Sequence, residues 1–295
     1  MLIRAGFEIA FDCPAPTPMI LMLSVRPERL GDLVTPQTIT VAPSVPLRAY
    51  RDSFGNICHR LIAPEGQTSF AADFLIRDSG LPDDVAPQAR QHPVDELPDD
   101  ALIYLLGSRY CETQALSDLA WAEFGTTAPG WSRVQAIVEY AHDRIGFSYA
   151  QARNTRTAYE AHQEQVGVCR DFAHLAITLC RCMNIPARYC TGYLGDIGIP
   201  AVPDPMDFSA WFEVFLGGRW RTFDARHNKP RIGRICVARG RDATDVAITT
   251  AFGRADLKLF TVITDEVQDE ASQLSEPQAA RRSPAESVHA GAPAA

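Results

Sequence analysis

Gly167-Val-Cys-Arg-Asp-Phe172 is the stretch at which the sequence pattern changes, and the fold is expected to be organised around it. Just before the change, β-branched residues disfavour a helix interior, and Gly167 allows a tight backbone turn. After it, apolar residues recur at helical spacing and form one stripe, made up of Phe172, Leu175, Ala176, Leu179, Cys180 and Met183. A helix is therefore predicted to begin at Cys169 and to stop before Pro186.

Cys169 is the candidate nucleophile, because it stands where this helix begins. Free backbone N–H groups and the positive end of the helix macrodipole favour a thiolate there, and the thiolate is the nucleophilic form. A small buried core cysteine is the alternative interpretation. The opposite side of the predicted helix carries Arg170, His174, Thr178 and Arg181.

A β-hairpin is predicted over residues 207–224, since alternating residues flank the two-residue turn Gly-Gly at 217–218. In the register that this turn favours, Ser209, Trp211 and Asp224 share one face of the hairpin. Polar and aromatic groups far apart in the sequence are thereby expected to lie together.

Three blocks in this order carry a family resemblance. They are GVCRDFAHL at 167–175, ARYCTGYL at 187–194 and AWFEVFLGGRWRTFD at 210–224. The blocks resemble the transglutaminase-like superfamily of cysteine enzymes. Over roughly residues 1–265 the chain resembles bacterial transglutaminase-like proteins with an N-terminal β domain. The resemblance implies a Cys-His-Asp triad and reaction through a thioester.

One position departs from that family pattern. Cys169 and Asp224 match the nucleophile and the orienting carboxylate, but Ser209 stands directly before Ala-Trp, where the family has its histidine. A serine hydroxyl cannot take up a proton near neutral pH, so it cannot be the base that a cysteine nucleophile needs. His227 is a possible substitute if the strand ends after Asp224 and the chain turns back toward Cys169.

Two aromatic residues are candidate substrate contacts. Trp211 is expected to form a wall of the cleft, and Tyr193 is expected to be either a core residue or a substrate contact. The sequence shows no calcium-loop spacing and no zinc pattern, so no cofactor and no metal are expected.

The fold class predicted from these patterns is α+β. A β-sandwich-like domain is expected at 1–80, a linker at 81–100, a transglutaminase-like domain at 101–268 and a disordered tail at 269–295. Short strands are predicted in the first domain at 3–11, 18–25, 38–41, 47–52, 57–62 and 69–77. In the second domain we predict helices at 112–124, 132–144 and 157–165 and further strands at 187–193, 234–238 and 259–264.

Composition limits the partners and the compartment. The net charge of −8 argues against nucleic acid and anionic membranes as partners. No signal peptide and no membrane span are evident in the sequence, and the eight scattered cysteines are expected to be reduced thiols. These features predict a cytoplasmic protein, while the sequence leaves its oligomeric state open.

Two functions follow from the residues and the resemblance. The first is a cysteine peptidase, amidohydrolase or acyl transferase that acts on a protein or peptide substrate through a Cys169 thioester. The second is a non-catalytic relative that binds peptide or amide ligands, because Ser209 replaces the family histidine. An activated Cys169 should react with iodoacetamide well below pH 8 and ahead of the other cysteines.

Overall fold

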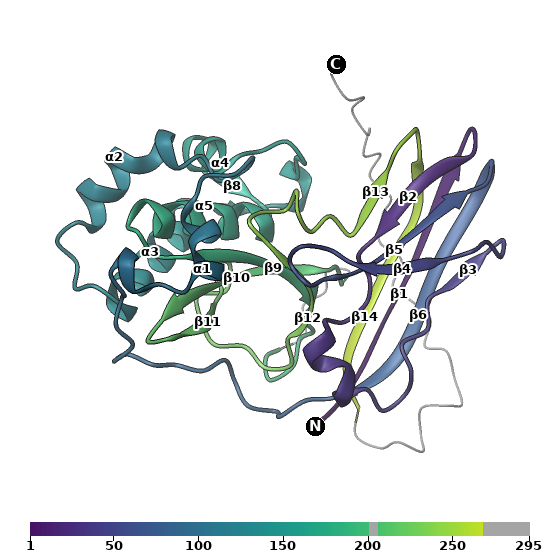
Figure 1. Ribbon diagram of the computed structural model, residues 1–295, viewed down its shortest axis with the longest axis horizontal. Coiled ribbons are helices and arrows are strands. Elements are labelled where there is room, and N and C mark those ends of the chain that lie inside the picture. The colour runs from purple at the N-terminus through teal and green to yellow at the C-terminus, as the bar shows by residue number, and fades with distance from the viewer. Residues whose placement is uncertain (201–205, 268–295) are drawn as a thin grey trace.

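The computed structural model describes residues 1–200 and 206–267 of the chain. The predicted disordered tail at 269–295 lies outside the described residues. Figure 1 shows two parts, a helical part built around a sheet and a part built of strands. This arrangement confirms the predicted α+β class with an additional β domain.

The β part contains two four-stranded antiparallel sheets. The first has the order β14-β1-β6-β3, with bounds Asp256–Val267, Leu2–Cys13, Gly66–Arg77 and Thr40–Ala42. The second has the order β13-β2-β5-β4, with bounds Thr249–Ala251, Thr17–Leu21, Ile57–Ala63 and Arg48–Arg51. All six strands predicted before residue 80 are present, and the alternating apolar residues of β1, β2, β5 and β6 bury one face of these strands.

The predicted domain boundary at residue 268 needs a correction. Strand β14 pairs with β1 from Leu2↔Val267 to Asp12↔Asp256, and β13 pairs with β2. The chain therefore returns from the helical part and completes both sheets of the β part (Figure 1). Local alternation predicted a strand at 259–264 correctly, but pairing across more than 240 residues depends on tertiary contacts that local patterns do not encode.

The helical part surrounds an antiparallel sheet of order β11-β10-β9-β12. Its strands are Arg219–Phe223, Ser209–Leu216, Ala187–Tyr193 and Ile235–Gly240. Its helices are α1 Asp99–Leu102, α2 Thr113–Phe124, α3 Trp131–Arg144, α4 Ala158–Glu164 and α5 Cys169–Cys182. A short parallel pair joins β7 Gly146–Phe147 to β8 Val166–Gly167. Short 3-10 helices occupy Pro27–Asp32, Val94–Glu96, Ile103–Leu105 and Tyr149–Gln151.

Helix α5 is the centre of the helical part. The predicted apolar stripe is confirmed, since Phe172, Leu175, Leu179 and Met183 are all buried against neighbouring elements. The polar side of α5 is buried as well. His174 stacks on a neighbouring tyrosine, and Arg181 donates to three backbone carbonyls, so buried polar groups have partners other than water.

The β part and the helical part share one hydrophobic core. Ring pairs cross between them, with Phe74 of β6 5.7 Å from Tyr193 of β9 and Phe7 of β1 6.4 Å from Phe208. Buried residues of both parts form a single contiguous cluster. The two parts are therefore packed together through aromatic side chains, which bury large apolar areas.

The segment predicted as a free linker is tied to the helical part along its length. In Figure 1 it runs along the lower edge of the molecule from β6 to α1. The Asp83 backbone N–H donates to the Arg231 carbonyl, and the Asp83 carboxylate accepts from the Arg231 backbone N–H. The Ala89 carbonyl accepts from Trp131, and the Arg90 carbonyl accepts from Gly217. Proline and acidic residues indicated an extended chain, and several backbone groups of this segment hydrogen-bond with the helical part.

Leu179 gives a test of the core. It is fully buried in α5, so Leu179→Ala should reduce the free energy of unfolding by about 2–5 kcal/mol through lost burial and a residual cavity. Urea denaturation measures this loss. Ile62→Ala is the matched control, because Ile62 is 62% exposed and should change stability by less than about 0.5 kcal/mol. Equal effects of both substitutions would contradict the central position of α5.

Candidate active site

The start of α5 is shaped by a side chain that folds back over it. The Asp171 carboxylate accepts a hydrogen bond from the backbone N–H of Val168 at 2.9 Å and pairs with Arg156 at 3.1 Å. A Cβ on Gly167 would lie 2.6 Å from Asp171, so only glycine leaves room for this cap. Glycine and aspartate in the motif thus hold Cys169 at the first turn of the helix.

The Cys169 thiol is half-buried at this position. Burial is the largest influence on its pKa and raises it, and the negative charges of Asp207 and Asp224 act in the same direction. Arg226 and a hydrogen bond from the backbone N–H of Ala210 oppose this rise without cancelling it. The resulting pKa is about 11, so the thiol is protonated at neutral pH.

This result contradicts the expectation that the helix start alone would activate Cys169. The macrodipole contributes roughly 0.3–1 kcal/mol, less than one pKa unit, and is too weak to reverse the effect of burial and nearby carboxylates. Sequence reasoning placed the cysteine on its helix but did not include the groups that the fold brings to it.

Three of those groups were missed by sequence reasoning, namely Asp207, Arg226 and Tyr149. Arg226 lies over the Phe147 ring at 3.8 Å and forms a hydrogen bond with Tyr149. Burial raises the pKa of the Asp207 carboxyl, an effect that water reduces because the residue is exposed. Their positions beside the predicted strand ends were the only sequence signal, and charged residues at strand ends are common.

Ser209 is the first residue of β10 and lies opposite Gly192 of β9. The side chain is buried, and its Oγ has no hydrogen-bond partner among the described residues. A buried hydroxyl without a partner costs free energy, so this position is not optimised for serine as a structural residue.

Asp224 follows directly after β11 and is also buried. Its carboxylate accepts a hydrogen bond from Arg234 at 2.8 Å and from the backbone N–H of His227 at 3.0 Å. Its other contact is with Nδ1 of the His227 ring at 2.9 Å. Burial alone would raise the pKa of Asp224, but Arg234 and His227 outweigh it and hold the pKa well below its usual range.

The ionised carboxylate determines which ring nitrogen of His227 carries its proton. A carboxylate can only accept, so Nδ1 must donate, and in the neutral ring Nε2 is then the proton acceptor. An imidazole oriented by an aspartate is thus present, three residues after the carboxylate and not at position 209.

The two predicted substrate contacts are both buried. Tyr193 is fully buried against Phe74 and Phe208, which favours the core alternative of the two that the sequence left open for it. Trp211 is 2% exposed and lies under the Arg234 guanidinium, 5.0 Å from the ring centroid. The hairpin register runs from Leu216↔Arg219 as predicted.

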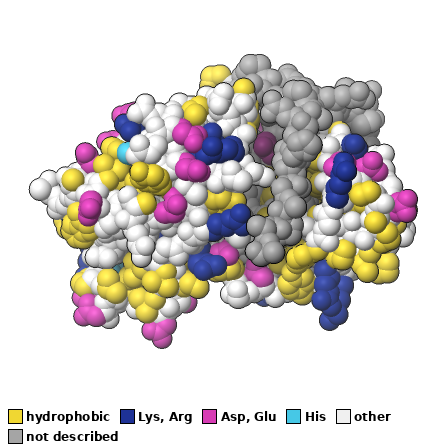
Figure 2. Space-filling view, turned by 90° about the horizontal axis from the view of Figure 1, so that it is seen from above, with side chains coloured by type: hydrophobic (Ala, Val, Ile, Leu, Met, Phe, Trp, Pro, Cys, Tyr) yellow, Lys and Arg dark blue, Asp and Glu magenta, His cyan; other side chains and the backbone are white. Residues whose placement is uncertain are grey.

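Other features of the described residues bear on possible ligands. Among residues 1–200 and 206–267, no group of three or more His, Cys, Asp or Glu side chains could hold a metal ion. Within the same ranges, no helix is long and apolar enough to cross a membrane. On the face shown in Figure 2, acidic and basic side chains are interspersed among uncharged ones.

Comparison with known proteins places this site in a family. A sequence model of the transglutaminase-like superfamily matches residues 120–225, which include Cys169, Ser209 and Asp224. A crystal structure of a candidate cysteine protease from Cytophaga hutchinsonii superposes with a TM-score of 0.78 and 29% identity, covering 92% of each chain. These two matches support a transglutaminase-like superfamily protein.

Two further matches cover less of the chain. An uncharacterized protein of Mycobacterium leprae is 31% identical over 137 residues, which is 44% of this chain and 49% of that protein. The match therefore spans about half the length of this curated relative. The periplasmic domain of TgpA from Pseudomonas aeruginosa has 13% identity and a TM-score of 0.39 over 77% of this chain and 89% of that domain, too low to support an argument.

The raised pKa of Cys169 gives a pH-dependence that alkylation can measure. Below the pKa the thiolate fraction rises about tenfold for each pH unit, so the iodoacetamide rate at Cys169 should rise about a hundredfold between pH 7 and 9. Mass spectrometry should find Cys169 labelled first, because the other seven cysteines are buried. Cys169→Ser is the control for assigning the label. A rate that levels off below pH 8 would show that the thiolate forms readily and would contradict this reading.

Proposed function

We propose that the chain is a cysteine enzyme that acts on amide bonds of a protein or peptide substrate, with Cys169 as the nucleophile. The observation that carries the proposal is the placement of the thiol at the capped start of α5, against the Ala210 amide and beside ionisable groups. Family membership supports the reaction class.

The proposed reaction is an acyl transfer. A base takes the Cys169 proton, the sulfur attacks the amide carbon, and the carbon–nitrogen bond breaks as the base returns the proton to the leaving amine. A thioester remains on Cys169. Water or a second amine then attacks it and releases the thiol. The N–H groups at the start of α5 are suited to stabilise the oxyanion of the intermediate.

The proton acceptor is the component in which this site departs from the family pattern. Ser209 occupies the position of the family histidine and cannot accept the proton. His227 has an oriented ring with a free acceptor nitrogen, which favours a rearranged triad of Cys169, His227 and Asp224. Installing the missing histidine and deleting His227 distinguishes these arrangements.

A second candidate function has its own supporting observation. The protonated thiol and the unpartnered Ser209 hydroxyl fit a relative that binds peptide or amide ligands without cleaving them. In this case the site would hold a ligand amide by hydrogen bonds, and Cys169 would remain unmodified.

The expected location remains part of the proposal. All eight cysteines are free thiols, which supports a reducing compartment and hence a cytoplasmic protein.

Ser209→His tests the missing-base interpretation. An imidazole at 209, oriented by Asp224, should accept the Cys169 proton and stabilise the thiolate as an imidazolium pair. We expect the alkylation rate of Cys169 at pH 7 to rise on the order of a hundredfold, with amidase activity rising in parallel. Labelling kinetics and hydrolysis of a peptide amide substrate measure the two effects.

His227→Ala is the matched comparison. If position 209 is the true base position, this substitution should leave the labelling of the wild-type background little changed. No gain at Ser209→His together with loss of activity at His227→Ala would show instead that His227 is the base. Circular dichroism spectra of both variants control for folding.

A further inference from the structure

Two cysteines of neighbouring strands lie in contact beside a polar cavity. Cys190 belongs to β9 and Cys236 to β12, and with Trp211 they form a small buried cluster that is separate from the main core. The two thiols form a hydrogen bond with each other. Cys236 also lines a cavity of about 240 Å³ whose walls are mainly charged side chains. The pair therefore has one member at the cavity and one, Cys190, that is fully buried.

The backbone of the two strands brings these cysteines close together. Cys236 lies opposite Gly192, two residues beyond Cys190 in β9, so both cysteines project from the same face of the sheet. The register of β12 shifts directly after Cys236. A Cβ on Gly192 would lie 3.0 Å from the Cα of Cys236, so glycine is what allows this close approach. Disulfides join residues whose Cα atoms lie within about 7 Å, and thiols already in contact on adjacent strands meet this need.

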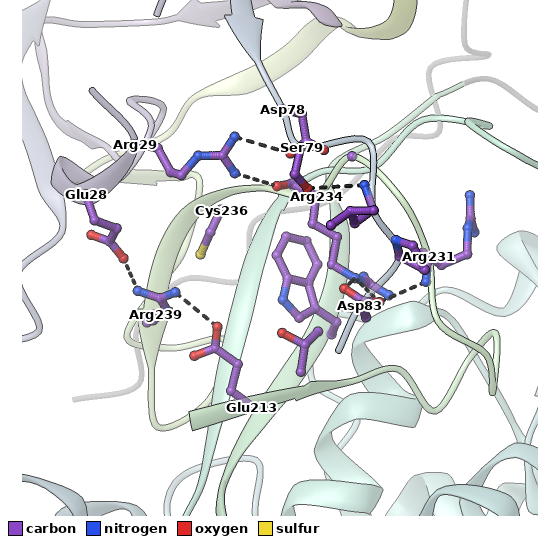
Figure 3. Close-up of a pocket in the computed structure, with 15 residues that line it drawn as sticks. Glu28, Arg29, Asp78, Ser79, Asp83, Glu213, Arg231, Arg234, Cys236 and Arg239 are labelled. Atoms are coloured by element: carbon purple, nitrogen blue, oxygen red, sulfur yellow. Dashed lines mark hydrogen bonds and ion pairs between the residues drawn. The ribbon is translucent and has the colours of Figure 1, made fainter. Parts of the chain in front are cut away.

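Cys236 is the member of the pair suited to react first. It is 8% exposed, and Figure 3 shows its side chain pointing to the side of the cavity where Arg239 and Glu213 lie. Burial raises the pKa of Cys236, and Glu213 acts in the same direction, but the hydrogen bond from Cys190 and the charge of Arg239 outweigh them and lower the pKa. Burial raises the pKa of Cys190. The thiolate therefore forms at Cys236, with the Cys190 thiol as its hydrogen-bond donor.

We propose that Cys236 and Cys190 are a peroxide-reactive dithiol, in which a small hydroperoxide oxidises Cys236 and Cys190 converts the product to a disulfide. The Cys236 sulfur attacks one peroxide oxygen, the sulfur–oxygen bond forms, and the oxygen–oxygen bond breaks. The peroxide gains two electrons and leaves as an alcohol or water with the Cys236 proton. Cys190 then attacks the sulfenic acid, the sulfur–sulfur bond forms, and water leaves with the Cys190 proton.

This chemistry is separate from that of Cys169. It uses neither the start of α5 nor a base for amide cleavage, so it can fail or succeed independently of the proposed function. Oxidation adds a single oxygen atom, whereas alkylation adds a larger group. A thiol that is 8% exposed at a cavity is thus open to peroxide, while the half-buried Cys169 stays the first to be alkylated.

Peptide mapping of the full chain in its native state tests the proposal. The reduced protein is treated with hydrogen peroxide at pH 7, its remaining thiols are blocked with N-ethylmaleimide, and it is digested with trypsin. We expect a disulfide-linked pair of the peptides 189–219 and 235–239, each of which contains one cysteine. Dithiothreitol should release the two peptides. Absence of this pair in the oxidised native protein, or its appearance only when denaturant is present, would overturn the proposal, and neither result depends on a substitution.

Substitutions assign the two roles. In Cys190→Ser, peroxide should leave Cys236 as a sulfenic acid that dimedone traps. In Cys236→Ser, labelling of Cys190 should be slower on the order of tenfold or more, because that thiol is fully buried and has a raised pKa. Cys13→Ser is the matched control, since Cys13 is also fully buried but does not line the cavity, and it should form the cross-link like the wild type. Equal labelling of Cys190 and Cys236 in the two variants would contradict the assigned order of reaction.

Discussion

The buried guanidinium of Arg234 is the constraint on which the surrounding architecture depends. It joins the extended segment after β6, through Asp83, to the end of the hairpin, through Asp224. It also covers the ring of Trp211 at 5.0 Å. A charge this deeply buried is stable only while both carboxylates stay in place, so the extended segment, the hairpin end and the cavity are held as one unit.

The two halves of the candidate site are held by different devices. On the helix side, Asp171 caps the start of α5 and forms an ion pair with Arg156. Asp171, two residues after Cys169, therefore has a structural role. On the sheet side, Asp224 orients His227 and is held by Arg234. Burial opposes ionisation of both the thiol and the carboxylate, but only Asp224 has cationic partners strong enough to overcome it.

The β part is built from strands that precede the helical part in the sequence and from strands that follow it. Strand β1 is flanked by β6 from the same end of the chain and by β14 from the far end. Without β14, an exposed edge of β1 would present unpaired backbone groups. Aromatic contacts such as Phe74–Tyr193 then bury this sheet against the helical part, which turns a predicted pair of separate domains into parts with a common core.

Local sequence pattern determined the helix that begins at Cys169, its buried stripe and the register of the Gly217-Gly218 hairpin, because these depend on residues close together in the chain. The three sequence blocks at 167–175, 187–194 and 210–224 indicated the superfamily, because each is a motif of neighbouring residues. Tertiary structure alone decided the pKa of Cys169 and the place of β14. Each of these depends on groups that meet only after distant segments close, where burial and charge set the balance and neither leaves a periodic signal in the sequence.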